Sequence, residues 1–164
     1  MYLTRLDIHG IRNVGSASFA PIDGINILYG ANGSGKTSIL EAIYLLGRGR
    51  TFRSRYTTTL INHDVRECTV FGAAESKEQK APYTIGVSRE ATGAFQFKVD
   101  GQRVSTSSSL ADAIPLLLMN SDSFLLIEGS HQVEVRQLYR FHIAHLHMAI
   151  ALYVNIKIQF DTDR

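Results

Sequence analysis

Eight consecutive residues, from Gly30 to Thr37, combine the main-chain freedom and the side chains that a phosphate-binding site needs. They read GANGSGKT and fit the pattern G-x-x-x-x-G-K-[ST] at every fixed position. Gly33 and Gly35 allow the main chain to curl tightly, so that successive N–H groups converge on anionic oxygens. The sequence therefore predicts a nucleoside triphosphate site. Its residues are Gly30, Ala31, Asn32, Gly33, Ser34, Gly35, Lys36 and Thr37.

The last two residues of this loop have the chemistry of a phosphate-binding lysine and a metal ligand. Lys36 would place its ammonium group against the β- and γ-phosphates, and the Thr37 hydroxyl would take one coordination position on Mg²⁺. A glycine-rich turn that holds no ligand does not call for a lysine followed by a hydroxyl residue. A dinucleotide-binding loop would need glycines in a different order from Gly30, Gly33 and Gly35.

A basic stretch, here named the arginine segment, follows at residues 47–55. It reads GRGRTFRSR and carries Arg48, Arg50, Arg53 and Arg55. Because it emerges from the helix expected after the loop, it could couple phosphate binding to an anionic partner, and the backbone of DNA is the partner that fits best. A solvated basic loop without a partner is the alternative, and both interpretations stay open.

Three other groups of side chains receive structural interpretations. We interpret Glu41, one helical turn after the loop, as an exposed helix carboxylate rather than a group near the metal. His142, His145 and His147 do not share one helical face and have no carboxylate or cysteine with them, so they do not predict a metal site. Cys68, the only cysteine, cannot form an intramolecular disulfide and is expected to be a small buried strand residue.

The composition is that of a soluble globular domain. Of the 164 residues, 45% are hydrophobic and 20% are charged, which excludes a disordered or fibrous chain. The net charge of +2 is too small to indicate nucleic-acid binding without a local cluster. The longest apolar run, from Ala113 to Met119, is too short to cross a bilayer and contains Pro115, and the N-terminus lacks the pattern of a secretory signal. These features predict a cytoplasmic location.

Elements on both sides of the loop are expected to hold it in place. The run from Ile25 to Tyr29 is almost continuously apolar. This predicts a strand in a sheet that is covered on both faces, with the strand leading directly into the loop. Apolar residues recur at helical spacing from Lys36 to Leu46, and Gly47 is expected to cap this helix. The strands expected before the loop are Tyr2 to Ile8, which Gly10 would end, and Ala17 to Phe19.

Smaller elements are expected after this helix. Three β-rich runs, with a hairpin turn at Asp100-Gly101, indicate a small antiparallel sheet. A helix that Ser109 can cap should end before Pro115. The three β-rich runs are residues 67–74, 82–89 and 95–99. The remaining expected elements are a strand at 116–119 and helices at 124–128 and 131–157. Together these elements predict an α/β fold in which a mixed sheet carries the loop helix, with the small antiparallel sheet beside it.

Several motifs, in this order along the chain, are specific in combination. They are Leu3 to Leu6 with Arg12 and Asn13, Gly30 to Leu46, Gly49 and Arg50 with Phe52 to Ser54, Val99 to Gly101, and Phe124 to Ser130. Over about residues 1–130 the chain resembles the N-terminal half of the RecF recombination mediators, a family of bacterial ATPases related to SMC and ABC ATPase heads. Residues 131–164 remain as a divergent, truncated helical segment.

The resemblance implies a P-loop ATPase head lobe that binds ATP and Mg²⁺ and forms an ATP-dependent homodimer. It also implies binding to single-stranded DNA and to single/double-strand junctions, and help in loading the recombinase at gaps, with the RecO and RecR proteins as partners. The cellular roles implied are DNA replication, recombination, repair of DNA damage and the SOS response. By position, Arg12 and Asn13 would lie near the nucleotide together with the loop.

Two departures from the family pattern bear on activity. After Gly129 and Ser130 the family continues with a proline, paired arginines and an aspartate, where this chain reads HQVEVRQ. The sequence also contains no ABC-type signature motif and no apolar run followed by Asp-Glu, the Walker B carboxylate and catalytic base of the family. A truncated or frame-shifted gene, or a fragment, would explain both departures. We therefore assign no catalytic residue and expect weak ATP binding and slow hydrolysis.

Two further functions stay open beside a RecF-like ATPase. One is a DNA-binding and dimerisation module that the nucleotide switches on without turnover. The other is a P-loop small-molecule kinase. A kinase would need a lid with arginines and an acidic residue on a later strand, and neither is found in the sequence.

Overall fold

The computed structural model describes residues 2–54, 56–75, 82–114, 116 and 118. Several predictions lie wholly or partly outside these residues: the strand at 116–119, the helices at 124–128 and 131–157 with their histidines, the boundary after residue 130, and Arg55. Within the described part, the chain forms six strands, two α-helices and a short 3-10 helix, η1 (Thr57–Leu60).

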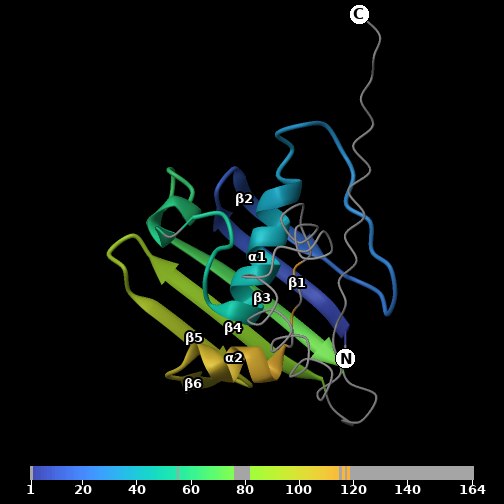
Figure 1. Ribbon diagram of the computed structural model, residues 1–164, viewed down its shortest axis with the longest axis vertical. Coiled ribbons are helices and arrows are strands. Elements are labelled where there is room, and N and C mark those ends of the chain that lie inside the picture. Colours follow the sequence, from blue (N-terminus) through green and yellow to red (C-terminus); the bar gives the residue numbers. More distant parts are fainter. Residues whose placement is uncertain (1, 55, 76–81, 115, 117, 119–164) are drawn as a thin grey trace, which may run out of the picture.

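The six strands form one antiparallel sheet in the order β2-β1-β3-β4-β5-β6 (Figure 1). They are β1 (Tyr2–Ile11), β2 (Val14–Phe19), β3 (Glu67–Glu75), β4 (Tyr83–Glu90), β5 (Phe95–Val99) and β6 (Gln102–Val104). The three β-rich runs predicted after the loop helix pair antiparallel as expected. The expected division into two sheets is not found among the described residues, because β3 pairs directly with β1.

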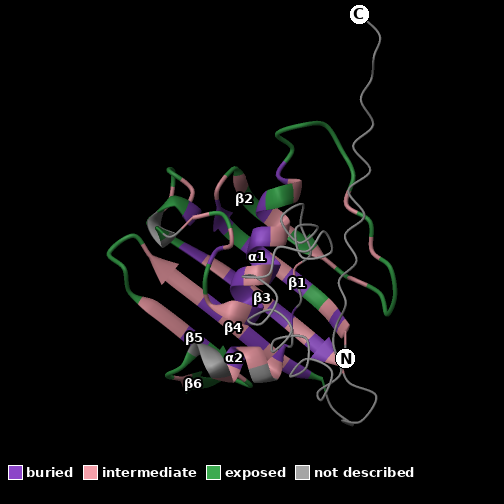
Figure 2. Ribbon diagram, viewed as in Figure 1, coloured by how far each residue is buried: buried purple, intermediate pink, exposed green. Residues whose placement is uncertain are grey.

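The core lies between one face of this sheet and the helices α1 (Lys36–Arg48) and α2 (Ser107–Ala113), as Figures 1 and 2 show. In β3 every second side chain from Cys68 to Ala74 is buried, and the side chains between them are only partly buried. An antiparallel sheet with one packed and one solvated face has this alternation. The burial of Cys68 confirms its predicted position.

No helix of the described part is long and apolar enough to cross a membrane.

The predicted strand from Ile25 to Tyr29 is wrong. The segment has no regular secondary structure and runs outside the sheet, within the long blue loop of Figure 1. Ile25, Ile27 and Tyr29 are 69%, 61% and 91% exposed. A strand needs hydrogen-bonding neighbours on its edges, and no strand of the described part pairs with this segment. Burial within the described part therefore does not account for its apolar pattern.

The helix after the loop is confirmed, but Gly47 does not cap it. Gly49 occupies the C-cap position with a φ of 64°, and its N–H donates to the carbonyl of Leu45 at 2.7 Å. Gly47 is instead a buried helical residue, and a Cβ there would lie 3.2 Å from the carbonyl oxygen of Ile114. An added Cβ would therefore fit only tightly between α1 and the end of α2.

Other boundaries differ from the predictions by a few residues. β1 continues through Gly10, which has a φ of 67°, instead of ending there. The hairpin at Asp100-Gly101 is confirmed, with φ values of 49° and 76° that are typical of a type I′ turn. α2 begins earlier than predicted, with Thr106 in the N-cap position instead of Ser109, and it ends before residue 115 as expected.

Gly72 on β3 marks a close contact between α1 and the sheet, and it gives a first prediction. A Cβ at this position would lie 2.5 Å from Leu46 Cδ2 and 3.2 Å from Leu3 Cδ2, and both leucines are buried. Gly72→Ala should therefore overpack the core and lower the free energy of unfolding by about 1–3 kcal/mol. Gly86→Ala on β4 is a matched control, since a Cβ there would meet only Lys98 Cβ at 4.0 Å. Chemical denaturation measures the free energy of unfolding of both variants. Equal losses in Gly72→Ala and Gly86→Ala would contradict the close packing at Gly72.

The buried thiol of Cys68 gives a second prediction. Burial raises the pKa of Cys68 to about 11 from 9.0, although the charge of Arg89 acts in the opposite direction. Because the pKa is higher in the folded state, the thiol contributes stability that is fully present below about pH 9 and is lost as the pH rises through about 11. Over this range the wild type should lose about 2–3 kcal/mol more stability than Cys68→Ala. Urea unfolding at several pH values would show this divergence, and parallel profiles would refute it.

Candidate functional site

The loop at residues 30–37 lies directly before α1, and its first residues are exposed to solvent. Gly30, Gly33 and Gly35 have φ values of 147°, 80° and 94°, a conformation that residues with a Cβ rarely adopt. The N–H of Ser34 donates to the carbonyl oxygen three residues earlier at 3.2 Å. The curled main chain that the sequence predicted is therefore present and open to a ligand.

Lys36, the first residue of α1, extends its ammonium group back over the loop. Its Nζ donates to the carbonyl oxygens of Gly30 at 2.7 Å and Ala31 at 2.8 Å. The first N–H groups of a helix lack intrahelical partners and favour an anion. A positive charge, main-chain donors at a helix N-terminus and access from solvent thus meet at one place. This arrangement fits a phosphate group.

Thr37 lies in the first turn of α1 and is exposed. In the described part, no cluster of three or more histidine, cysteine, aspartate or glutamate residues could hold a metal ion. Beside bound phosphates, the Thr37 hydroxyl could take one coordination position on Mg²⁺, with phosphate oxygens and water among its other ligands.

Asn13 connects the loop to α1 from the turn between β1 and β2. Its Nδ2 donates to the carbonyl oxygen of Gly33 at 2.6 Å, and its Oδ1 accepts a hydrogen bond from Ser38 Oγ at 2.7 Å. The following residue, Val14, also packs against the loop, since a Cβ at Gly35 would lie 2.8 Å from Val14 Cγ2. The turn therefore holds the loop from one side.

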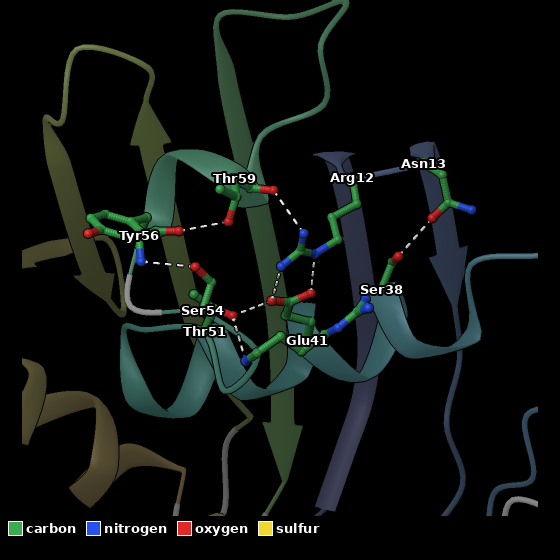
Figure 3. A network of polar contacts seen from close by, with 9 residues as sticks. Arg12, Asn13, Ser38, Glu41, Thr51, Ser54, Tyr56 and Thr59 are labelled. Carbon is green, nitrogen blue, oxygen red and sulfur yellow. Dashed lines mark hydrogen bonds and ion pairs between the residues drawn. The ribbon is translucent and has the colours of Figure 1, made fainter. Parts of the chain in front are cut away.

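Arg12 lies beside Asn13 but is directed at Glu41 of α1 (Figure 3). Its Nε and Nη2 donate to the two carboxylate oxygens, with 2.8 Å between Nη2 and Oε1. Its Nη1 donates to the carbonyl oxygen of Thr59 in η1 at 3.0 Å. The hydrogen bonds to Glu41 raise the pKa of Arg12. The structure thus brings Asn13 against the loop, whereas the guanidinium of Arg12 contacts α1 and η1.

The interpretation of Glu41 as an exposed carboxylate is wrong. Its side chain is fully buried on the face of α1 that also carries Ser38 and Leu45. The hydroxyl of Thr51 donates to Oε1 as well. A charged carboxylate is tolerated in a core only when it is paired and hydrogen-bonded, so Glu41 depends on Arg12 and Thr51.

The described arginines of the arginine segment differ in their surroundings. Arg48 belongs to α1, and its Nη2 donates to the carbonyl oxygen of Leu116 at 2.6 Å. Arg50 and Arg53 are exposed. The part of the segment that can meet a partner therefore begins after the end of α1.

Two contacts hold the arginine segment against α1. Thr51, which is only 7% exposed, donates to Glu41 and accepts the main-chain N–H of Arg53 at 3.1 Å. Phe52 packs edge to face on Tyr44 of α1, with 5.4 Å between ring centroids. The path of the segment is therefore fixed by the helix that begins in the loop.

Sequence reasoning missed the roles of Ser38, Glu41 and Thr51. A signal existed for the first two, because Ser38, Glu41, Ala42 and Leu45 have the i, i+3, i+4, i+7 spacing of a single buried helix face. For Thr51 the sequence holds no such signal, since its contact depends on how the chain returns to α1 after Gly49.

The chain matches the family model described as RecF/RecN/SMC N terminal domain over residues 2–124. Among curated relatives, the DNA replication and repair protein RecF of Pseudomonas fluorescens (strain Pf0-1) is 44% identical over 146 residues, which cover 89% of this chain and 39% of that protein. The RecF protein of Stutzerimonas stutzeri (strain A1501) is 44% identical over 152 residues, covering 91% and 40%. The chain thus spans about two fifths of the length of these relatives.

Solved structures show the same fold. The recombination mediator protein RecF-ATP of the RecFOR pathway matches with a TM-score of 0.74 and 24% identity, over 87% of this chain and 39% of that one. A structure described by the ATP-driven dimerization and DNA stimulated activation of SMC ATPases matches with a TM-score of 0.70 and 18% identity. The match covers 86% of this chain and 99% of that one. The predicted head-lobe fold of a P-loop ATPase is confirmed. The chain belongs to the family of RecF/RecN/SMC N-terminal domains.

Proposed function

We propose that this chain binds ATP with Mg²⁺ at residues 30–37 and that its role is that of a RecF-like DNA repair protein. The observation that carries the proposal is the position of Lys36 Nζ, 2.7 and 2.8 Å from the carbonyl oxygens of Gly30 and Ala31 in an open, curled loop. Charged phosphate oxygens are stronger acceptors than neutral carbonyls. Lys36 would therefore exchange the two carbonyls for β- and γ-phosphate oxygens.

The relatives support ATP as the nucleotide and a dimer as the assembly. One matching RecF structure is described as RecF-ATP, and one matching SMC structure is described by ATP-driven dimerization. Thr37 would supply its hydroxyl to Mg²⁺, which offsets the charge of the phosphates. We infer that ATP promotes a homodimer of this chain, because a ligand that binds one assembly state more tightly shifts the equilibrium toward that state.

For DNA, the exposed side chains of Arg50 and Arg53 support a contact with the phosphate backbone. Arg48 is the weaker candidate because its guanidinium already donates to the carbonyl of Leu116. We also propose that the chain binds single-stranded DNA and single/double-strand junctions and helps to load the recombinase at gaps. Its proposed partners are the RecO and RecR proteins, and its proposed location is the cytoplasm. The relationship to the RecF proteins supports these points.

A module that binds ATP without turnover is the second candidate. The observation that favours it is the pairing of Glu41, the carboxylate one turn after Thr37. Both of its oxygens accept hydrogen bonds, from Arg12 and from Thr51, so it supplies neither a metal ligand nor a base for water. Phosphoryl transfer depends on positioned charge and on a group that orients water. We therefore expect the 164-residue chain to hydrolyse ATP slowly.

Lys36→Ala should weaken ATP binding roughly 10- to 150-fold, because a charge-assisted hydrogen bond contributes about 1.5–3 kcal/mol. Isothermal titration with ATP in the presence of Mg²⁺ measures the affinity. Lys98→Ala removes an equal charge from an exposed position on β5 and should leave the affinity unchanged. If Lys36→Ala bound ATP as tightly as the wild type, the nucleotide would have to bind elsewhere.

Replacing Arg50 and Arg53 together by alanine should weaken binding to a single-stranded oligonucleotide. The slope of log affinity against log salt should become shallower by about 1.4, since each phosphate contact to a single strand contributes about 0.7. Fluorescence anisotropy at several salt concentrations measures this slope. A double variant with alanine at Arg66 and Arg103, two other exposed arginines, loses the same net charge and is the matched control. An equal change in the control would show that the arginine segment is not the contact.

A further inference from the structure

The hydrogen bonds to the Glu41 carboxylate come from two segments that are far apart in the sequence (Figure 3). Arg12 donates two of them from the turn between β1 and β2, and Thr51 donates one from the arginine segment. Glu41 itself lies on α1, one turn after Thr37. A single buried carboxylate therefore joins the helix that begins in the loop to two separate connections.

Each partner of this carboxylate is linked in turn to a part of the molecule that the proposed function uses. Arg12 is followed by Asn13, whose Nδ2 lies 2.6 Å from the carbonyl oxygen of Gly33 in the loop. Thr51 accepts the N–H of Arg53, an exposed arginine, at 3.1 Å. Polar contacts, joined at one step by the peptide bond between Arg12 and Asn13, thus lead from the phosphate-binding loop to the arginine segment.

These contacts leave the connected segments little freedom to move separately. Glu41 is 0% exposed and Thr51 is 7% exposed. Arg12 is held on its other side by η1, because its main-chain N–H and its Nη1 donate to carbonyl oxygens there at 2.8 and 3.0 Å. A buried carboxylate that loses its charged partner is left with uncompensated charge, and one that loses a hydroxyl donor is left with fewer hydrogen bonds. A shift of the loop is therefore expected to move the arginine segment with it.

We propose that Glu41 is a positioning residue that fixes the arginine segment relative to the loop, so that ATP at residues 30–37 raises the affinity of this segment for single-stranded DNA. The inference rests on the function proposed above for the loop and the segment. A purely structural ion pair would stabilise the fold without making DNA affinity depend on ATP. The coupling is also reciprocal, so DNA raises the affinity for ATP by the same factor.

Thr51→Val tests the coupling, because it removes the hydroxyl that joins Glu41 to the arginine segment and keeps the ion pair with Arg12. Thr51→Ser restores the hydroxyl. Thr92→Val is the matched control, since the Thr92 hydroxyl also donates to a carboxylate, Glu90 Oε2 at 3.0 Å, but in the exposed turn between β4 and β5. Anisotropy of a labelled single-stranded oligonucleotide gives the Kd of the full chain with and without ATP and MgCl₂.

In the wild type, Thr51→Ser and Thr92→Val, ATP should tighten DNA binding by about fivefold or more. In Thr51→Val this factor should fall below about twofold, while the affinity for ATP alone stays within about twofold of the wild type. A Thr51→Val protein that keeps the full factor overturns the inference and leaves the proposed function standing. A wild type that binds no ATP or no DNA refutes the proposed function, and the inference falls with it.

Hydrogen exchange of the wild-type protein tests the coupling without relying on the folding of a variant. Addition of ATP and MgCl₂ should slow amide exchange at residues 51–53 as well as at residues 30–37, because both segments are held through the same carboxylate. Protection at both segments supports the coupling. Protection confined to the loop overturns it.

Discussion

The burial of one charged carboxylate determines how the connections around α1 are arranged. Glu41 is fully buried, its charge is compensated by the guanidinium of Arg12, and the hydroxyl of Thr51 donates a further hydrogen bond. Arg12 reaches it from a turn in which the arginine itself has a φ of 48°, a conformation that costs energy for a residue with a Cβ. The same turn carries Asn13, which holds Gly33. One ion pair therefore compensates a buried charge in the core and anchors the turn that contacts the phosphate-binding loop.

The sheet supplies the rigid support for this arrangement. α1 packs closely on β3, with Leu46 against Gly72, and also approaches the end of α2 at Gly47. With the helix held along its length, its first turn is fixed at the end of the sheet where β1 turns into β2 (Figure 1). Lys36 and Thr37 are thus presented to solvent by a helix that is itself anchored in the core.

The features that the sequence predicted correctly are those that depend on local chemistry. The loop, its helix and the hairpin at Asp100-Gly101 require particular residues at particular backbone positions, and the residues themselves indicate them. The predicted strand from Ile25 to Tyr29 was wrong because a strand also needs neighbouring strands to pair with. The apolar pattern of a short segment does not show whether such neighbours exist. The prediction that Glu41 is exposed was wrong for a related reason. A carboxylate is expected at the surface unless a partner compensates its charge, and the sequence does not show that Arg12 lies beside it.

A crystal structure of this chain with Mg²⁺ and a slowly hydrolysed ATP analogue would show whether residues 30–37 bind the nucleotide. We expect Lys36 Nζ to leave the carbonyls of Gly30 and Ala31 for the β- and γ-phosphates, while Asn13 stays bound to Gly33 and Arg12 to Glu41. A nucleotide bound away from residues 30–37, or a Lys36 that still contacts both carbonyls beside bound phosphates, would contradict this expectation.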